Sequence, residues 1–154
     1  MFRSVLIAID GTPRSLGILD TVKRFCDPEQ YLLHVLLAVD SAYALEEFDQ
    51  RLSRFDQTEY PAAAQEQLQA DKIMQEAIQA FEQAGFSTTG SQELGEPADA
   101  IIKAAKARNI DLIVMGHRHL SRLKRMLDPS IASKVIDEAS CPVLIDAHPQ
   151  SPRH

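Results

Sequence analysis

The residues best suited to chemistry form a basic cluster that follows Gly116. No acidic residue stands between Gly116 and Asp128, and several residues of this stretch can carry a positive charge: His117, Arg118, His119, Arg122, Lys124 and Arg125. Guanidinium, ammonium and imidazolium groups bind phosphate oxygens through charge-assisted hydrogen bonds. The cluster therefore indicates an anion site. It is equally consistent with a solvated basic loop, or with a loop that pairs with the acidic residues Glu46, Glu47 and Asp49.

Asp10 is the second candidate, because it directly follows the apolar run from Val5 to Ile9. Ligands of open α/β sheets bind at the carboxyl ends of strands, so this position favours a role in binding. The alternative is a carboxylate that only caps the turn before the next helix. His34 stands inside another apolar run, and we expect it to be a buried histidine whose hydrogen bonds are satisfied.

Other kinds of chemistry have little support. His117 and His119 lack the cysteine or carboxylate partners of a zinc site, so neither a metal site nor a catalytic residue is predicted. The sequence contains no nucleophile–base pattern, no Gly-x-x-x-x-Gly-Lys-Ser/Thr motif and no Gly-x-Gly-x-x-Gly motif. We therefore expect at most weak ATP hydrolysis.

The elements that position these residues alternate between strand and helix, which is typical of a parallel sheet with helices on both faces. Four apolar runs predict strands over residues 4–10, 31–39, 111–115 and 143–146, and a weaker pattern predicts a fifth over residues 87–94. Helices are predicted after Thr12 as N-cap, over 62–84, after Pro97 and after Asp128 as N-cap. Their core-facing residues are expected to include Leu16, Leu19, Val22 and Phe25, then Leu68, Ile73, Ala77 and Phe81, then Ile131, Val135 and Ile136.

Length and composition predict one domain over residues 1–146. Residues 41–61 interrupt the pattern and are interpreted as an insertion that covers a site or meets a partner, and residues 147–154 as a disordered tail. A net charge of −6 argues against a nucleic-acid partner. No apolar run is long enough to span a membrane, and neither cysteine lies in a Cys-x-x-Cys pattern, so a cytoplasmic location is expected.

Four motifs, in order along the chain, resemble the universal stress protein family. They are the strand end Ala8-Ile9-Asp10-Gly11-Thr12, the helix start Gly95-Glu96-Pro97-Ala98, the strand Asp111 to Gly116, and the strand Pro142 to Ile145. The resemblance implies an adenine-nucleotide α-hydrolase-like fold, a three-layer α/β sandwich whose five-stranded parallel sheet has the order 3-2-1-4-5. It also implies a stress-response sensor that binds AMP or ATP, the latter with Mg²⁺, at the carboxyl ends of strands one and four.

By the same resemblance, the nucleotide-binding residues are expected to be Ile9, Asp10, Gly11, Val39, Met115, Gly116, Arg118, His119, Ser130 and Ile131. The family also implies a homodimer through the last strand, at Val143, Leu144 and Ile145. The alternative is a dimeric interaction protein that binds no nucleotide and meets an unidentified protein partner through the insertion and the dimer surface.

The sequence departs from the family at the phosphate site. Nucleotide-binding members carry Gly-x-x-Gly, nine residues, then Gly-Ser/Thr. Gly116 and Ser130 match, but His119 and Pro129 replace two glycines. Glycine allows the backbone to approach a phosphate, and a helix start offers free N–H groups to it. Pro129 has no N–H, and the carboxylate of Asp128 would occupy the remaining donors and repel an anion. Fewer backbone contacts to phosphate are therefore expected.

Overall fold

The computed structural model describes residues 2–39, 61–121 and 126–147. The predicted insertion (41–61) lies outside these ranges except for residue 61, and the predicted tail (147–154) lies outside them except for residue 147. Both predictions therefore stay untested.

The sheet is parallel and has the predicted strand order. Its strands are β1 (Arg3–Ile9), β2 (Tyr31–Val39), β3 (Thr88–Leu94), β4 (Leu112–Gly116) and β7 (Val143–Asp146), arranged β3-β2-β1-β4-β7. In sequence order this is 3-2-1-4-5, so the predicted topology is confirmed. The register pairs Ile7 of β1 with Val35 of β2 and with Val114 of β4, which brings the carboxyl ends of β1 and β4 together.

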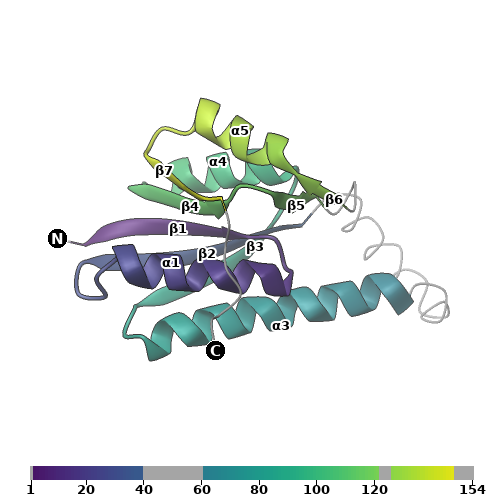
Figure 1. Cartoon of the computed structure of the whole chain (residues 1–154), viewed down its shortest axis with the longest axis horizontal. Coiled ribbons are helices and arrows are strands. Elements are labelled where there is room, and N and C mark those ends of the chain that lie inside the picture. The colour runs from purple at the N-terminus through teal and green to yellow at the C-terminus, as the bar shows by residue number, and fades with distance from the viewer. Residues whose placement is uncertain (1, 40–60, 122–125, 148–154) are drawn as a thin grey trace.

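Helices cover both faces of this sheet, as Figure 1 shows. The short 3₁₀ helix η1 (Pro13–Leu16), α1 (Gly17–Phe25) and α3 (Pro61–Gln83) lie on one face, and α4 (Pro97–Ala107) and α5 (Pro129–Glu138) lie on the other. Within the described residues, no helix is both long and apolar enough to cross a membrane.

Two apolar clusters, one on each face, hold the three layers together. Successive side chains of a strand point to opposite faces, so Val5 and Ile7 of β1 pack with α1 and α3, while Leu6 and Ala8 pack with α4 and α5. All four side chains are at most 1% exposed. A strand buried on both faces must be apolar throughout, and this explains the unbroken run that identified β1.

Several helix predictions are corrected. Phe25, Leu68 and Ile136 are 61%, 68% and 55% exposed, although helical spacing placed them on core-facing stripes. Each is displaced around its helix from the buried set, which is Ile18, Val22 and Cys26 near α1, Ala70, Met74 and Ala77 in α3, and Ile131, Ala132 and Val135 in α5. One residue turns a helix by about 100°, so an error of one position moves a side chain to the rim or outside.

The start of the first helix and the basic loop also differ from the prediction. Thr12 precedes η1 rather than α1 and makes no side-chain cap, because its hydroxyl donates to Asp10 Oδ1 at 2.6 Å. Part of the predicted loop after Gly116 is a hairpin of β5 (His119–Ser121) and β6 (Met126–Asp128). Its strands have three residues each, too few for a periodic pattern to reveal.

His34 of β2 is a buried histidine with satisfied hydrogen bonds, as predicted. It is 5% exposed, and its ring nitrogens lie 2.7 Å from Thr89 Oγ1 and 2.8 Å from Ser91 Oγ across the β2–β3 pair. Burial, together with the charge of Arg108, lowers the pKa of His34 from 6.5 to about 4. The folded protein therefore resists protonation of this ring.

This shift predicts an acid-dependent loss of stability. The unfolded chain binds the proton first, so the contribution of His34 is complete above pH 6.5 and disappears as the pH falls toward 4. The loss is at most about 3 kcal/mol in the free energy of unfolding. Urea unfolding at pH 7 and pH 4.5 should show a smaller loss in His34→Gln, whose amide does not titrate, than in the wild type. His117→Gln, at an exposed position, is the control. An equal loss in all three proteins would contradict the assignment.

Candidate functional site

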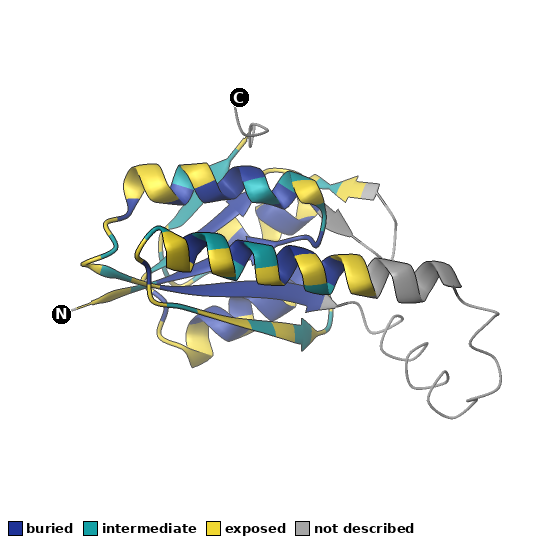
Figure 2. Ribbon diagram, turned by 90° about the horizontal axis from the view of Figure 1, so that it is seen from below, coloured by how far each residue is buried: buried dark blue, intermediate teal, exposed yellow. Residues whose placement is uncertain are grey.

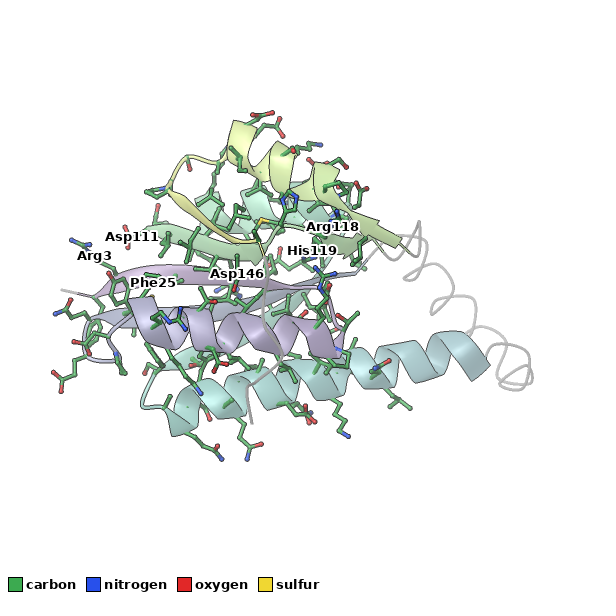
Figure 3. The ribbon with its side chains drawn as sticks, viewed as in Figure 1. Arg3, Phe25, Asp111, Arg118, His119 and Asp146 are labelled. Atoms are coloured by element: carbon green, nitrogen blue, oxygen red, sulfur yellow. The ribbon has the colours of Figure 1, made fainter. Side chains whose placement is uncertain are left out.

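A small cavity lies between the carboxyl ends of β1 and β4, where the sequence predicted a ligand. Its walls come from both strand ends, from the turn after β1, from α1 and from the connection to β5: Ala8, Asp10, Arg14, Ser15, Ile18, Gly116, Arg118 and His119. Figure 3 shows Arg118 and His119 beside each other between β4 and α1. The predicted residues Asp10, Gly116, Arg118 and His119 therefore meet at one site.

The carboxylate of Asp10 organises the turn that follows β1. Asp10 is 7% exposed, and its Oδ1 accepts hydrogen bonds from the Thr12 N–H at 3.0 Å, from the Thr12 hydroxyl and from the Ser15 hydroxyl. The Asp10 N–H in turn donates to Ser15 Oγ at 3.0 Å. Gly11 has a φ of 76°, a left-handed conformation that glycine adopts without strain. The capping role is thus realised, and the same carboxylate also lines the cavity.

Asp10 remains ionised inside this site. Burial by itself would raise the pKa of its carboxyl. The charge of His119 and the hydrogen bonds from Ser15 and Thr12 outweigh burial, so the pKa lies below the usual 3.8. The site at neutral pH therefore contains a buried negative charge that faces an imidazole and two arginines.

His119 fills the position where the family pattern has a glycine. It begins β5, where it pairs with Asp128 of β6, and is 4% exposed. The remaining cavity has a volume of about 10 Å³, which is roughly the space that one water needs. A phosphate group could enter this position only if the imidazole moved out of it.

The start of α5 has the N-cap that the sequence predicted. Asp128 is the N-cap, and its Oδ1 accepts from the Ser130 N–H at 3.0 Å and from the Ser130 hydroxyl at 2.5 Å. Pro129 occupies the first position of the helix and has no N–H. Ser130 does not line the cavity, and its two donors already serve the Asp128 carboxylate.

Of the other predicted contact residues, Ile9, Gly11, Met115 and Ile131 do not line the cavity. Ile9 is 3% exposed in the α1–α3 cluster, while Met115 and Ile131 are at most 2% exposed in the α4–α5 cluster. Val39 ends β2, and its side chain is outside the described part of the structure. Their roles as nucleotide contacts stay predictions. Of the basic cluster, Arg122, Lys124 and Arg125 lie outside the described residues.

Arg14 and Ser15 are site residues that sequence analysis missed. Both lie in η1, and both line the cavity. The available signal was their distance from Asp10: a tight turn after a strand returns the fourth and fifth following residues to the strand end. Because Arg14 supplies a second guanidinium beside Arg118, the site is more basic than the loop alone indicated.

Comparison with known proteins identifies the family of this chain. The model of the universal stress protein family matches residues 1–146. The chain belongs to the universal stress protein family. Universal stress protein YxiE of Bacillus subtilis is 32% identical over 149 residues, covering 94% of this chain and 99% of YxiE.

Solved structures show the same fold. The structure of MJ0577, a universal stress protein of Methanocaldococcus jannaschii, superposes with a TM-score of 0.69 at 25% identity and covers 94% of this chain and 95% of that one. A universal stress protein solved in complex with cAMP superposes with a TM-score of 0.63 at 22% identity, covering 96% and 98% of the two chains. The predicted adenine-nucleotide α-hydrolase-like fold is therefore confirmed.

Among the described residues, no group of three or more histidine, cysteine, aspartate or glutamate side chains could hold a metal ion. Asp10 is the carboxylate that lines the cavity, and its Oδ1 already accepts hydrogen bonds from the hydroxyls of Thr12 and Ser15. The described residues therefore offer no evident magnesium site of their own.

The role of Asp10 in the turn predicts a measurable loss of stability. Asp10→Asn keeps the shape of the side chain but removes the charge, so the hydroxyl donors of Thr12 and Ser15 lose a charge-assisted acceptor. We expect the free energy of unfolding to fall by about 1–3 kcal/mol. Urea unfolding measures this change, with the exposed Asp20→Asn as a control that should change little. A loss below about 0.5 kcal/mol in Asp10→Asn would show that the carboxylate does not hold the turn.

Proposed function

We propose that this protein is a cytoplasmic stress-response sensor that binds an adenine nucleotide, AMP or ATP, at the carboxyl ends of β1 and β4. The observation that carries the proposal is one cavity at these two strand ends, which is lined by Asp10, Arg14, Arg118 and His119. Membership of the universal stress protein family supports it, as does the similarity of the fold to a family member in complex with cAMP.

Phosphate recognition in this proposal depends on side chains. Since Pro129 has no N–H and Asp128 accepts from the Ser130 N–H, the guanidinium groups of Arg14 and Arg118 bind the phosphate oxygens instead. Two cations at one cavity suit one phosphate group, and AMP is then bound about as well as ATP.

His119 competes with the ligand in this proposal. Its side chain occupies the space beside Asp10, so binding includes the free energy of moving a buried imidazole out of the site. Apparent affinity falls by the fraction of molecules in which the site is open. The expected affinity is therefore weaker than the basic residues alone would give.

Removal of the imidazole should strengthen binding. In His119→Gly the cavity opens and the backbone regains the freedom that glycine gives at this position, so the Kd for AMP should fall by about tenfold, or 1.4 kcal/mol. Calorimetric titration of nucleotide-stripped protein measures Kd. His117→Gly, two residues away and exposed, is the matched control and should leave Kd unchanged.

Two results would contradict this role of His119. One is an unchanged or weaker affinity in a folded His119→Gly protein. The other is an equal gain in His117→Gly, which would trace the effect to flexibility of the segment instead of the imidazole. Arg118→Gln adds a test of the phosphate contacts, because a protein that binds AMP through this guanidinium should lose affinity at least fivefold.

The closed cavity favours a second candidate function, a dimeric interaction protein that binds no nucleotide. The observation behind it is the volume of about 10 Å³ together with the capped start of α5. In that case the insertion and the dimer surface contact a protein partner. Absence of heat in a titration of both the wild type and His119→Gly with millimolar AMP and ATP would favour this function.

We further propose a homodimer through the free edge of β7. Within the described residues β7 pairs only with β4, and Val143, Leu144 and Ile145 are each partly exposed. The ladder to β4 uses the carbonyls of Pro142 and Asp146, so the N–H groups of Val143 and Ile145 point away from β4. An apolar edge with unused donors is a template for pairing with a second copy.

The dimer is tested with a proline at this edge. Ile145→Pro removes an outward N–H and leaves the bonds to β4 in place, so the variant should elute as a monomer with an unchanged far-ultraviolet circular dichroism spectrum. Ile145→Val keeps the N–H and should stay dimeric. A dimer of unchanged stability in Ile145→Pro, measured by light scattering across a dilution series, would exclude this edge as the interface.

A further inference from the structure

A second and larger cavity lies at the amino-terminal ends of the strands, opposite the Asp10 site. It has a volume of about 320 Å³, within the range of small-molecule binding sites. It is lined by ends of β1 and β2, by the start of β3 and by the segment after α4, with main contributions from Ser4, Leu32, His34, Thr89, Arg108 and Ile110. The two cavities have no lining residue in common.

The cavity exists because helix cover does not extend to this corner of the sheet. Leu32 and His34 share a face of β2 with Leu36, which packs in the α4–α5 cluster. That cluster contains buried residues of β1, β2 and β4 but none of β3. Figure 2 shows β3 with intermediate and exposed residues along the edge of the sheet, and Leu32 remains 39% exposed.

The walls of this cavity combine apolar and polar groups. On this face of the sheet the apolar side chains are those of the buried Ile110 and of Leu32, which is exposed at the rim. Val5 and Leu33 belong to the α1–α3 cluster on the other face, so they line the cavity with their backbone. Apolar walls with a few polar groups are the usual lining of sites for small organic ligands. The polar groups therefore determine which ligand would bind.

His34 fixes the hydrogen-bonding role of Thr89. The imidazole is neutral at pH 7, because its pKa is lowered to about 4, so one ring nitrogen donates and the other accepts. Ser91 Oγ donates to Glu93 Oε1 over a long 3.4 Å, so Ser91 accepts from Nε2–H of His34. Nδ1 then accepts from the Thr89 hydroxyl, and Thr89 Oγ1 can accept a hydrogen bond from a ligand.

Arg108 supplies the positive charge of this cavity. It is the C-cap of α4, and among the described residues it forms no ion pair with a carboxylate. The last carbonyls of α4 are occupied, since Ala104, Ala105 and Lys106 accept from the N–H groups of Arg108, Ile110 and Asn109, the last with a φ of 52°. The nearby carboxylate of Asp111 accepts from the Ser4 N–H at 2.7 Å.

We propose that this cavity is a second ligand site, which binds a small amphiphilic acid. The carboxylate of the ligand pairs with Arg108, an apolar ring packs between Leu32 and Ile110, and an O–H or N–H group of the ligand donates to Thr89 Oγ1. This site is independent of the nucleotide site, because it lies at the opposite ends of the strands.

The test uses 3- and 4-hydroxybenzoate as probes in a heteronuclear NMR titration of the full-length protein. These probes carry a carboxylate, a ring and a hydroxyl donor. We expect saturable shifts of the Thr89 amide and of the His34 imidazole resonances. Benzoate lacks the donor and 4-hydroxybenzamide lacks the charge, and each should bind about fivefold more weakly or worse, since charge-assisted and satisfied hydrogen bonds contribute most to such sites.

Two variants locate the site. Arg108→Gln should abolish the preference for hydroxybenzoate over hydroxybenzamide. Arg24→Gln, at an exposed position of α1, is the control and should keep this preference. Leu32→Trp fills the cavity from its rim at an exposed position and should prevent binding in a folded protein. The proposal is overturned if no saturable shift occurs near Thr89 and His34, or if Arg108→Gln and Leu32→Trp bind like the wild type.

The same variants separate this site from the nucleotide site. Calorimetric titration of Leu32→Trp with AMP should give the wild-type Kd, and His119→Gly should bind hydroxybenzoate like the wild type. Loss of AMP binding in Leu32→Trp would mean that the two cavities are coupled and would contradict the independence claimed here.

Discussion

The structure depends most on the carboxylate of Asp10, which is buried at the end of the central strand. It accepts hydrogen bonds from the N–H and hydroxyl of Thr12 and from the hydroxyl of Ser15. These bonds stabilise the turn that leads from β1 into η1 and α1. A buried carboxylate has a large desolvation cost, and these donors together with His119 offset it. The same carboxylate lines the cavity at the strand ends, because β1 lies beside β4 and residues after β4 line the same cavity.

This arrangement changes how a universal stress protein can meet a phosphate. Backbone recognition needs glycines and free N–H groups at a helix start, whereas here α5 begins with Asp128 and Pro129. What remains near the strand ends is side-chain chemistry, in the form of two arginines and one buried histidine. Side chains can move, so a site of this kind can be closed without ligand and open with it. A glycine-lined backbone site has no side chain that could close it.

Much of the fold could be predicted because the central strands β1, β2 and β4 are largely buried and their apolar runs are nearly unbroken. Asp10 was identified from its place at a strand end, and Gly116, Arg118 and His119 from the basic cluster and the family pattern. The loss of helix-start donors followed from Asp128 and Pro129. Phe25, Leu68 and Ile136 were placed by local spacing, but tertiary contacts decide which face of a helix is buried. Thr12 was expected to cap a helix, but its hydroxyl donates to Asp10. Arg14 and the β5–β6 hairpin were missed because short turns carry little periodicity.

In the function proposed above, the imidazole of His119 occupies the place that a nucleotide phosphate takes. NMR of the His119 imidazole during a titration with AMP tests it most directly, because a buried ring beside Asp10 and a solvated ring have different chemical shifts and pH dependence. We expect saturable AMP binding to move the His119 resonances to those of a solvated imidazole, with the same midpoint as calorimetry. Saturable binding that leaves the His119 resonances unchanged would contradict it.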